Sequence, residues 1–262
     1  MTTVSDILAF LETIAPAYMK ESWDNVGLNV GHREQEVKKI LVALDPFAHV
    51  CREAKDIGAD LLLTHHVLIF RPGFVTDATA QGQNTLFLIE NGIAHINAHT
   101  NLDLAPRGVN DVLAKTLCLR NIRIIEPKGL DHKGREWGLL RSGETDAQSL
   151  ADFLALVKEK LGCEGLRYAD SGRTVHKVAV GGGSCCDEMQ QALDAGCDTL
   201  VTGDAKYNDF WDARDLGLNL IDAGHFYTEN PVVAYLAEEI SAHFPDITVK
   251  ISETHHDCMK FY

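Results

Sequence analysis

The chain repeats part of its own sequence, and this constrains the fold more than any other feature. With the 262-residue sequence shifted by 138 positions, residues 37–64 align without a gap to residues 175–202, and 9 of the 28 aligned pairs are identical. Self-similarity at one fixed offset indicates a structural unit that occurs twice. We therefore interpret the chain as the product of an internal duplication and expect two domains of similar fold.

Each copy predicts a strand, a helix and a second strand. In the first copy, the apolar runs Ile40–Leu44 and Leu61–Leu63 flank a helix-compatible stretch that ends at Gly58, a residue type common just after a helix. The second copy has the same parts at Val178–Val180, Thr199–Val201 and Gly196. Such units form parallel strand pairs with a right-handed crossover, and ligands collect beyond the carboxyl ends of the strands.

The remaining segments complete the prediction of an α/β fold with mixed sheets flanked by helices. Trp137–Leu140 is strand-like, and Asp146–Leu161 has the apolar spacing of an amphipathic helix. Pro231–Phe244 predicts a further helix, with proline in its first turn. The expected domains are a first α/β domain over residues 1–122 and a second over 123–244, with a strand within 245–262 that can return to the first sheet.

Charge and composition argue against several classes of protein. The chain has 38 acidic and 24 basic residues and a formal net charge of −14, which disfavours sequence-independent binding to nucleic acid or to an anionic membrane. It has neither the run of roughly 20 apolar residues that a membrane helix needs nor a basic and then apolar leader, so we expect a cytoplasmic protein. The seven cysteines are odd in number and lack paired C-x-x-C spacing, which indicates reduced thiols.

Polar side chains follow the predicted strands at their carboxyl ends. Six of them are candidate metal ligands or neighbours of a metal site: His65, His66, His99, Asp103, His225 and Glu229. The last four form two pairs spaced by four residues, which places both members of a pair on one side of a helical turn. Imidazole and carboxylate without thiolate suit Zn, Fe, Mn, Co or Ni, and the number of ligands fits two ions. The alternative interpretation is that these residues cap helices or lie solvated in loops.

Five short motifs occur in order along the chain. They are W-D-N-V-G-L at 23–28, T-H-H-x-x-x-F at 64–70, H-T-N-L-D at 99–103, T-G-D-x-K-Y at 202–207 and G-H-x-x-T-E at 224–229. Together they resemble the NIF-three-like family, which includes GTP cyclohydrolase 1 type 2 and its homologues, over nearly the whole chain. Two positions depart from the usual family pattern: Val67 stands where many members have proline, and Asn208 where many have histidine.

The resemblance implies two similar α/β domains, a metal site in the cleft between them and assembly into a toroidal homohexamer. It also implies two divalent metal ions per chain, held by His65, His66, Asp103, His225 and Glu229. Glu229 is the expected bridging ligand, because a carboxylate has two oxygens to share, and His99 is the expected acid/base or supporting residue. Asp204 and Lys206, at the matching strand end of the second copy, are expected to orient a substrate or its phosphate.

The implied activity is that of a dinuclear metal-dependent hydrolase acting on a nucleotide, with GTP as the substrate of the resembled family. Two other classes stay open: a phosphohydrolase or nuclease, which uses the same pair of metals, and a non-catalytic metal-binding scaffold that interacts with other proteins. The sequence has no P-loop motif, and Gly181–Ser184 is more typical of a tight turn than of a phosphate-binding loop. The pair His255–His256 favours a solvated tail over extra metal ligands.

Overall fold

The computed structural model describes residues 1–71 and 73–262, which form two compact units. Unit 1 consists of Met1–Leu102 and Val233–His256, and unit 2 of Asp103–Val232 and Asp257–Tyr262. The chain passes from one unit to the other after Leu102 and after Val232, whereas the expected boundaries were at residues 122 and 244. Residues 103–119 belong to unit 2 because Leu113 and Ala114 of the helix at Val109–Thr116 pack in a core of that unit, and β5 (Arg120–Ile124) then pairs antiparallel with β8 (Arg141–Gln148).

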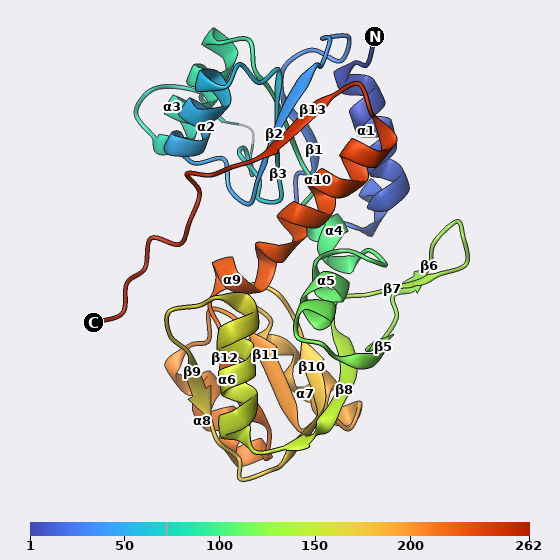
Figure 1. The fold of residues 1–262 in the computed structure, drawn as a ribbon, viewed down its shortest axis with the longest axis vertical. Coiled ribbons are helices and arrows are strands. Elements are labelled where there is room, and N and C mark those ends of the chain that lie inside the picture. Colours follow the sequence, from blue (N-terminus) through green and yellow to red (C-terminus); the bar gives the residue numbers. More distant parts are fainter. Residues whose placement is uncertain (72) are drawn as a thin grey trace. The chain divides into compact units, whose positions relative to one another are not determined.

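The sheet of unit 1 has five strands in the order β1-β4-β3-β2-β13. Their bounds are β1 Gly27–Val30, β2 Lys39–Ala43, β3 Leu61–Thr64, β4 Ala94–Asn97 and β13 Thr248–Ile251. Strands β13, β2, β3 and β4 are parallel, and β1 pairs antiparallel with β4 at one edge. The late strand β13 thus lies beside β2 in the first sheet (Figure 1).

Helices cover both faces of this sheet. Their bounds are α1 Val4–Ile14, α2 Ala48–Asp56, α3 Ala80–Glu90, α4 Thr100–Leu104 and α10 Pro231–His243, with a 3-10 turn η1 at Ala17–Met19. Helices α2 and α3 lie on one face and α1 and α10 on the other (Figure 1). Leu41 and Leu62 of the central strands pack with Val50 of α2 in one buried cluster. Gly58 follows α2 with a φ of +65° and so ends that helix as predicted.

Unit 2 is built on a six-stranded sheet in the order β5-β8-β10-β11-β12-β9. The bounds not yet given are β9 Arg167–Ala169, β10 Val175–Val180, β11 Thr199–Thr202 and β12 Asn219–Asp222, with a separate hairpin of β6 Gly129–Leu130 and β7 Glu136–Trp137. Strands β10, β11 and β12 are parallel, while β8 and β9 flank them antiparallel. The sheet is mixed, as the sequence predicts.

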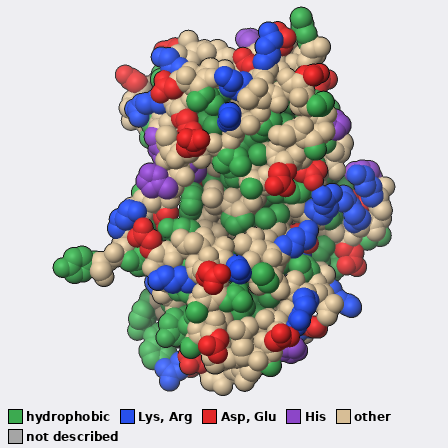
Figure 2. Space-filling view, viewed as in Figure 1, with side chains coloured by type: hydrophobic (Ala, Val, Ile, Leu, Met, Phe, Trp, Pro, Cys, Tyr) green, Lys and Arg blue, Asp and Glu red, His purple; other side chains and the backbone are tan. Residues whose placement is uncertain are grey.

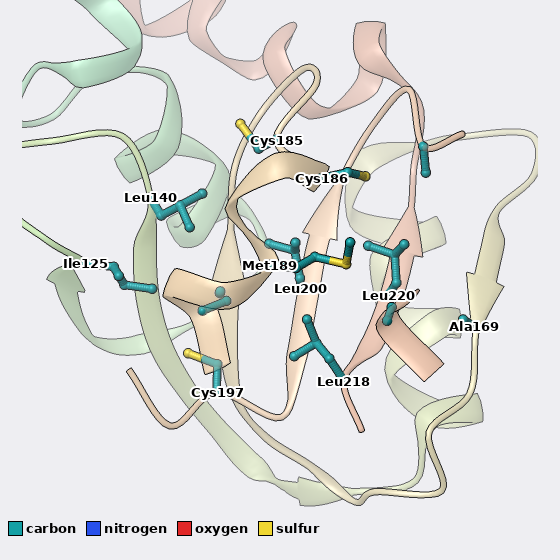
Figure 3. Packing of buried hydrophobic residues seen from close by; sticks show 14 residues of the cluster. Ile125, Leu140, Ala169, Cys185, Cys186, Met189, Cys197, Leu200, Leu218 and Leu220 are labelled. Carbon is teal, nitrogen blue, oxygen red and sulfur yellow. The ribbon is translucent and has the colours of Figure 1, made fainter. Parts of the chain in front are cut away.

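Alternate residues of the parallel strands supply two separate cores of unit 2. The helices are α5 Val109–Thr116, α6 Leu150–Leu161, α7 Met189–Asp194, α8 Tyr207–Leu216 and α9 His225–Glu229, with a 3-10 turn η2 at Cys186–Glu188. Leu200 of β11 packs with Met189 of α7 in the cluster drawn in Figure 3. The next residue, Val201, packs on the opposite face with Phe153 of α6. Burial on both faces explains why these strands are apolar runs and do not alternate with polar residues.

The two units repeat specific side-chain contacts at the offset of 138 residues. Asp60 in unit 1 and Asp198 in unit 2 each accept a hydrogen bond from the backbone N–H of a lysine in the preceding strand, Lys39 or Lys177. The ammonium groups of the same two lysines each donate to a backbone carbonyl at the end of the intervening helix. The strand register also agrees between β2–β3 and β10–β11. These matched contacts support the duplication inferred from the sequence.

Two predicted elements are shorter than expected. The strand predicted at Trp137–Leu140 is limited to β7, because the carbonyls that follow turn to accept hydrogen bonds from the Arg141 guanidinium. The helix predicted at Asp146–Leu161 begins at Leu150, because β8 occupies the preceding residues and the Ser149 hydroxyl caps the helix. In both places a specific hydrogen bond overrides the local apolar pattern.

Charged side chains of both signs lie on the surface of the protein (Figure 2). No helix among the described residues is long and apolar enough to cross a membrane. On the face drawn in Figure 2, Lys and Arg side chains are interspersed with Asp and Glu, and no continuous basic track crosses that face.

Acid is expected to destabilise unit 1 through the buried His95 of β4. Thr64 donates its hydroxyl proton to a backbone carbonyl, so the His95 Nε2–H donates to Thr64 Oγ1 at 2.8 Å and the ring is neutral. Burial lowers the pKa of His95 from 6.5 to about 3. Between those values the unfolded chain binds a proton that the folded chain does not, so stability is full above pH 6.5 and falls as the pH falls.

The free energy of unfolding of the wild type should therefore drop by about 2 kcal/mol more than that of a His95→Gln variant between pH 7 and pH 5. Urea titrations at the two pH values measure this difference. Equal losses in both proteins would contradict the assignment of this acid sensitivity to His95.

Candidate metal centre

Three histidines of unit 1 converge beyond the carboxyl ends of β3 and β4. His65 and His66 follow β3, and His99 comes shortly after β4, directly before α4. The ring centroids are 4.9 Å apart for His65 and His66, and 5.4 and 5.6 Å from these two rings to His99. One nitrogen of each ring lies within 4.8 Å of the nitrogens of the other two. Parallel strands end at one edge of the sheet, which is why the sequence predicts this cluster.

Hydrogen bonds determine which nitrogen of His65 and His66 faces a ligand. The His65 Nδ1–H donates to the carbonyl of Ala98 at 2.8 Å, and the His66 Nδ1–H donates to Asp45 Oδ1 at 2.6 Å. A neutral imidazole has one N–H, so the lone pair of each ring is on Nε2. An oxygen acceptor on Nδ1 with Nε2 as the ligand atom is the usual arrangement of metal-binding histidines.

Asp24 holds His99 in the same way. The His99 Nδ1–H donates to Asp24 Oδ1 at 2.9 Å, while Thr100 donates to the other carboxylate oxygen from its N–H and its hydroxyl. Burial alone would raise the pKa of the Asp24 carboxyl, but these hydrogen bonds outweigh burial and lower the pKa from 3.8 to about 2. Asp24 is therefore an anion at neutral pH, and it fixes the tautomer of His99.

Unit 2 carries its own set of ligand-type side chains around α9. His225 and Glu229 are the first and last residues of this helix, and His225 Nε2 lies 3.0 Å from Glu229 Oε2. The His225 Nδ1–H donates to Asp204 Oδ2 at 2.7 Å. Burial, and after it the charges of Asp103 and Glu229, raise the pKa of the Cys185 thiol well above its usual range. Two carboxylates predicted as ligands thus act on the same buried thiol.

The glycine turn after β10 makes room for these side chains. A Cβ on Gly183 would lie 2.2 Å from Glu229 Oε1 and 3.1 Å from the His225 ring, and the φ of Gly183 is +67°. The N–H of Gly183 donates to a threonine hydroxyl of α9, and the N–H before it donates to Asn110. Because these donors are used within unit 2, the turn supports candidate ligands and does not form a phosphate-binding loop.

A model of a known protein family matches almost the whole chain. The model that describes Duf34/NIF3 (NGG1p interacting factor 3) matches residues 2–258. The chain belongs to the Duf34/NIF3 family. A Clostridium perfringens protein named GTP cyclohydrolase 1 type 2 homolog is 38% identical over 262 residues, which cover 98% of this chain and 99% of the relative. The crystal structure of Staphylococcus aureus protein SA1388 has a TM-score of 0.92 and 30% identity, and the alignment covers 100% of this chain and 99% of that chain.

Membership in the Duf34/NIF3 family confirms the resemblance that the five sequence motifs carry, and with it the α/β fold. A Streptomyces coelicolor protein, also named GTP cyclohydrolase 1 type 2 homolog, is 38% identical over 97% of this chain and 92% of its own length. The matched residues 2–258 include every predicted metal ligand in both units.

The two residues predicted to contact a substrate have different surroundings in this Duf34/NIF3 chain. Asp204 adopts a left-handed φ of +54°, and its carboxylate accepts the hydrogen bond from His225. This contact favours a role in orienting His225 over direct contact with a substrate. Lys206 is exposed and stands at the beginning of α8, where its backbone N–H donates to Asp209.

Sequence reasoning missed a pair of residues behind His66. Asp45 accepts from His66 at Oδ1 and from His255 Nε2 at Oδ2, the latter at 2.9 Å. Burial alone would raise the pKa of the Asp45 carboxyl, but the hydrogen bonds from His255 and His66 hold it well below its usual range. Asp45 comes soon after β2, so the strand-end rule that identified His65 would also have found Asp45.

His255 is not part of the solvated tail that the sequence favours, whereas its neighbour His256 is exposed. The His255 side chain is 4% exposed. Glu53 of α2 accepts four hydrogen bonds from residues 252–254, through two hydroxyls and two backbone N–H groups. These hydrogen bonds hold residues 252–254 against unit 1, so that His255 lies next to Asp45.

The side chains of both units fit divalent metal ions. His65, His66 and His225 each have an oxygen in contact with Nδ1, so Nε2 is the nitrogen that would bind a cation. The 3.0 Å separation of His225 Nε2 and Glu229 Oε2 brings a lone pair next to a carboxylate, which is favourable only with a cation or a proton between them. Nitrogen and carboxylate donors without thiolate suit Zn, Fe, Mn, Co or Ni.

Proposed function

We propose that this chain is a dinuclear metal-dependent hydrolase that acts on a nucleotide, with chemistry like that of GTP cyclohydrolase 1 type 2. The observation that carries the proposal is the shared orientation of His65, His66 and His225, in which an oxygen contacts Nδ1 and Nε2 is the nitrogen that would bind a cation. The family and the name of its relatives favour this activity over other uses of such ligands. In this proposal the chain works in the cytoplasm, and it assembles into the toroidal homohexamer that the sequence resemblance implies.

The proposed ligands of two divalent ions are His65, His66, Asp103, His225 and Glu229. His65 and His225 would hold one ion, and His66 and Asp103 the other. Glu229 would complete the set, because its carboxylate has two oxygens to share. Affinity alone does not choose between the five candidate metals, since such sites take up ions according to availability.

The chain's own contribution to the reaction is proton transfer and orientation. Two bound ions would supply a water of near-neutral pKa and a Lewis acid for a developing oxyanion. Opening the imidazole ring of GTP adds two waters at C8, releases that carbon as formate and moves protons to the ring nitrogens. His99 presents Nε2 for this transfer, and Asp24, bonded to Nδ1, holds the ring in that orientation.

The test counts metal ions and products on the same preparation. Protein reconstituted with Zn, Mn or Fe is expected to hold close to two ions per chain and to release one formate for each GTP consumed. A His99→Gln variant should keep its ions and lose formate release by roughly 100-fold or more, the usual contribution of a general acid or base. His32→Gln, a change at an exposed histidine of unit 1, is the matched control.

Other outcomes would assign the chain to other classes. Release of phosphate or nucleoside without formate would identify a phosphohydrolase or nuclease. A chain that binds no ion with all five ligands intact would contradict the dinuclear site itself. The chain would be a scaffold if it binds metal stably but forms no product from GTP, and if loss of the metal changes only assembly or partner binding.

A further inference from the structure

Two exposed aromatic side chains of unit 1 lie next to the three histidines. Trp23 is 59% exposed and Phe70 is 45% exposed. Their ring centroids are 6.3 Å apart, and the ring planes are inclined by only 28°. Large aromatic side chains that cluster at the surface, and are not packed in the core, are typical of a ligand-binding surface.

The two rings line a hollow beside His99. Arg71 and Gln81 complete the lining, and the hollow has a volume of about 480 Å³, which is in the range of small-molecule sites. His99 lies edge-on to both aromatic rings, with its centroid 6.0 Å from that of Trp23 and 5.7 Å from that of Phe70. A flat molecule stacked on the aromatic rings would therefore have its edge close to the proposed acid or base.

Hydrogen bonds hold both aromatic loops in place. Asp24, next to Trp23 in the chain, is buried and fixed by its bonds to the start of α4. Asn25 Nδ2 donates to the carbonyl of Ile69, the residue before Phe70, at 2.5 Å. The backbone that carries the two aromatic side chains is thus fixed before a ligand arrives, and preorganised groups lose little entropy on binding.

We propose that this hollow binds the planar heteroaromatic base of the substrate, stacked on Trp23 and Phe70, while Arg71 pairs with a phosphate of the same molecule. The inference rests on the proposed function and names the part of the substrate that unit 1 recognises. Stacking on Trp and Phe accepts any flat π system, whereas a guanidinium forms two parallel hydrogen bonds with phosphate. Gln81 adds an amide that can donate to or accept from the edge of the ring.

Binding to the metal-free protein tests this inference apart from catalysis. Isothermal titration calorimetry would compare guanosine, GTP and inorganic triphosphate as ligands. The Kd for guanosine is expected to rise roughly tenfold in Trp23→Ala and to return close to the wild-type value in Trp23→Phe. Trp211→Ala, which removes a tryptophan of unit 2 that is 49% exposed, should leave the Kd unchanged. Arg71→Ala should weaken the binding of GTP while the Kd for guanosine stays the same.

Each result decides one of the two claims. Unchanged guanosine binding in Trp23→Ala, or binding of triphosphate alone, would overturn the hollow as a base-binding site. Guanosine binding that depends on Trp23 in a protein that never releases formate would keep the hollow and reject the hydrolase. Formate release with an unaltered KM for GTP in Trp23→Ala would keep the hydrolase and reject the hollow.

Discussion

Protein with His66→Ala is expected to retain at most one of its two proposed ions after dialysis and to bind metal at least about 100-fold more weakly than the wild type. The imidazole is lost as a ligand, and the carboxylate of Asp45 is left without the partner that it orients. Metal analysis after dialysis gives the number of ions, and competition with a chelator gives the affinity. If the variant binds two ions at wild-type affinity, His66 is not a metal ligand.

A graded series separates the ligand from the groups behind it. Asp45→Asn should weaken metal binding by roughly 10- to 100-fold, the usual loss when an outer partner of a ligating histidine is removed. His255→Gln should have a smaller effect, because Asp45 keeps its direct bond to His66. His32→Ala again serves as the control, and the circular dichroism spectrum of each variant shows whether it is folded.

Arg141→Met is expected to destabilise the protein by about 3–5 kcal/mol, the usual result when one partner of a buried ion pair is removed. The Arg141 side chain is fully buried, and its Nε donates to Asp111 Oδ2 at 2.8 Å. The guanidinium also donates to the carbonyls of Ala105 at 2.9 Å and of Gly138 at 2.7 Å. Methionine fills much of the space but leaves these acceptors without a donor.

Denaturant titration with hydrogen exchange measures this loss and locates it in unit 2. Arg120→Met is the matched control, because Arg120 pairs with Asp146 at the surface, where both side chains are more than half exposed. Exposed pairs contribute at most about 1 kcal/mol. Arg141 is proposed to join the chain before α5 to the segment between β7 and β8, through its bonds to Ala105 and Gly138. Equal losses of stability in the two variants would contradict this role.

The central strands and the positions of the histidines could be predicted because both follow from the apolar pattern. Buried runs such as Leu61–Leu63 mark parallel strands, and the residues just after them must lie at one edge of the sheet. The repeat fixed the correspondence between the copies, so that β10 and β11 could be predicted from β2 and β3. Local rules therefore placed His65, His66 and His225 at ends of strands without any structure.

Two side chains behind the histidines, His255 and Asp24, could not be predicted, because their contacts join distant parts of the chain. Asp45 and His255 are 210 residues apart, and His99 and Asp24 are 75 residues apart. No apolar spacing encodes such a pair, and so the sequence favoured a solvated tail at His255. The same holds for Trp23 and Phe70, which belong to different motifs and become one surface only in the folded unit.

The position of β13 in the chain affects how the protein is made. Strand β13 is the neighbour of β2, yet Thr248–Ile251 leave the ribosome after almost all of unit 2. At the usual speed of synthesis, β2 waits on the order of ten seconds for this partner. During that time its unpaired edge can join another nascent chain. Unit 1 therefore has an unpaired β2 edge until Thr248–Ile251 are made, and a premature stop shortly before Thr248 would leave that edge unpaired.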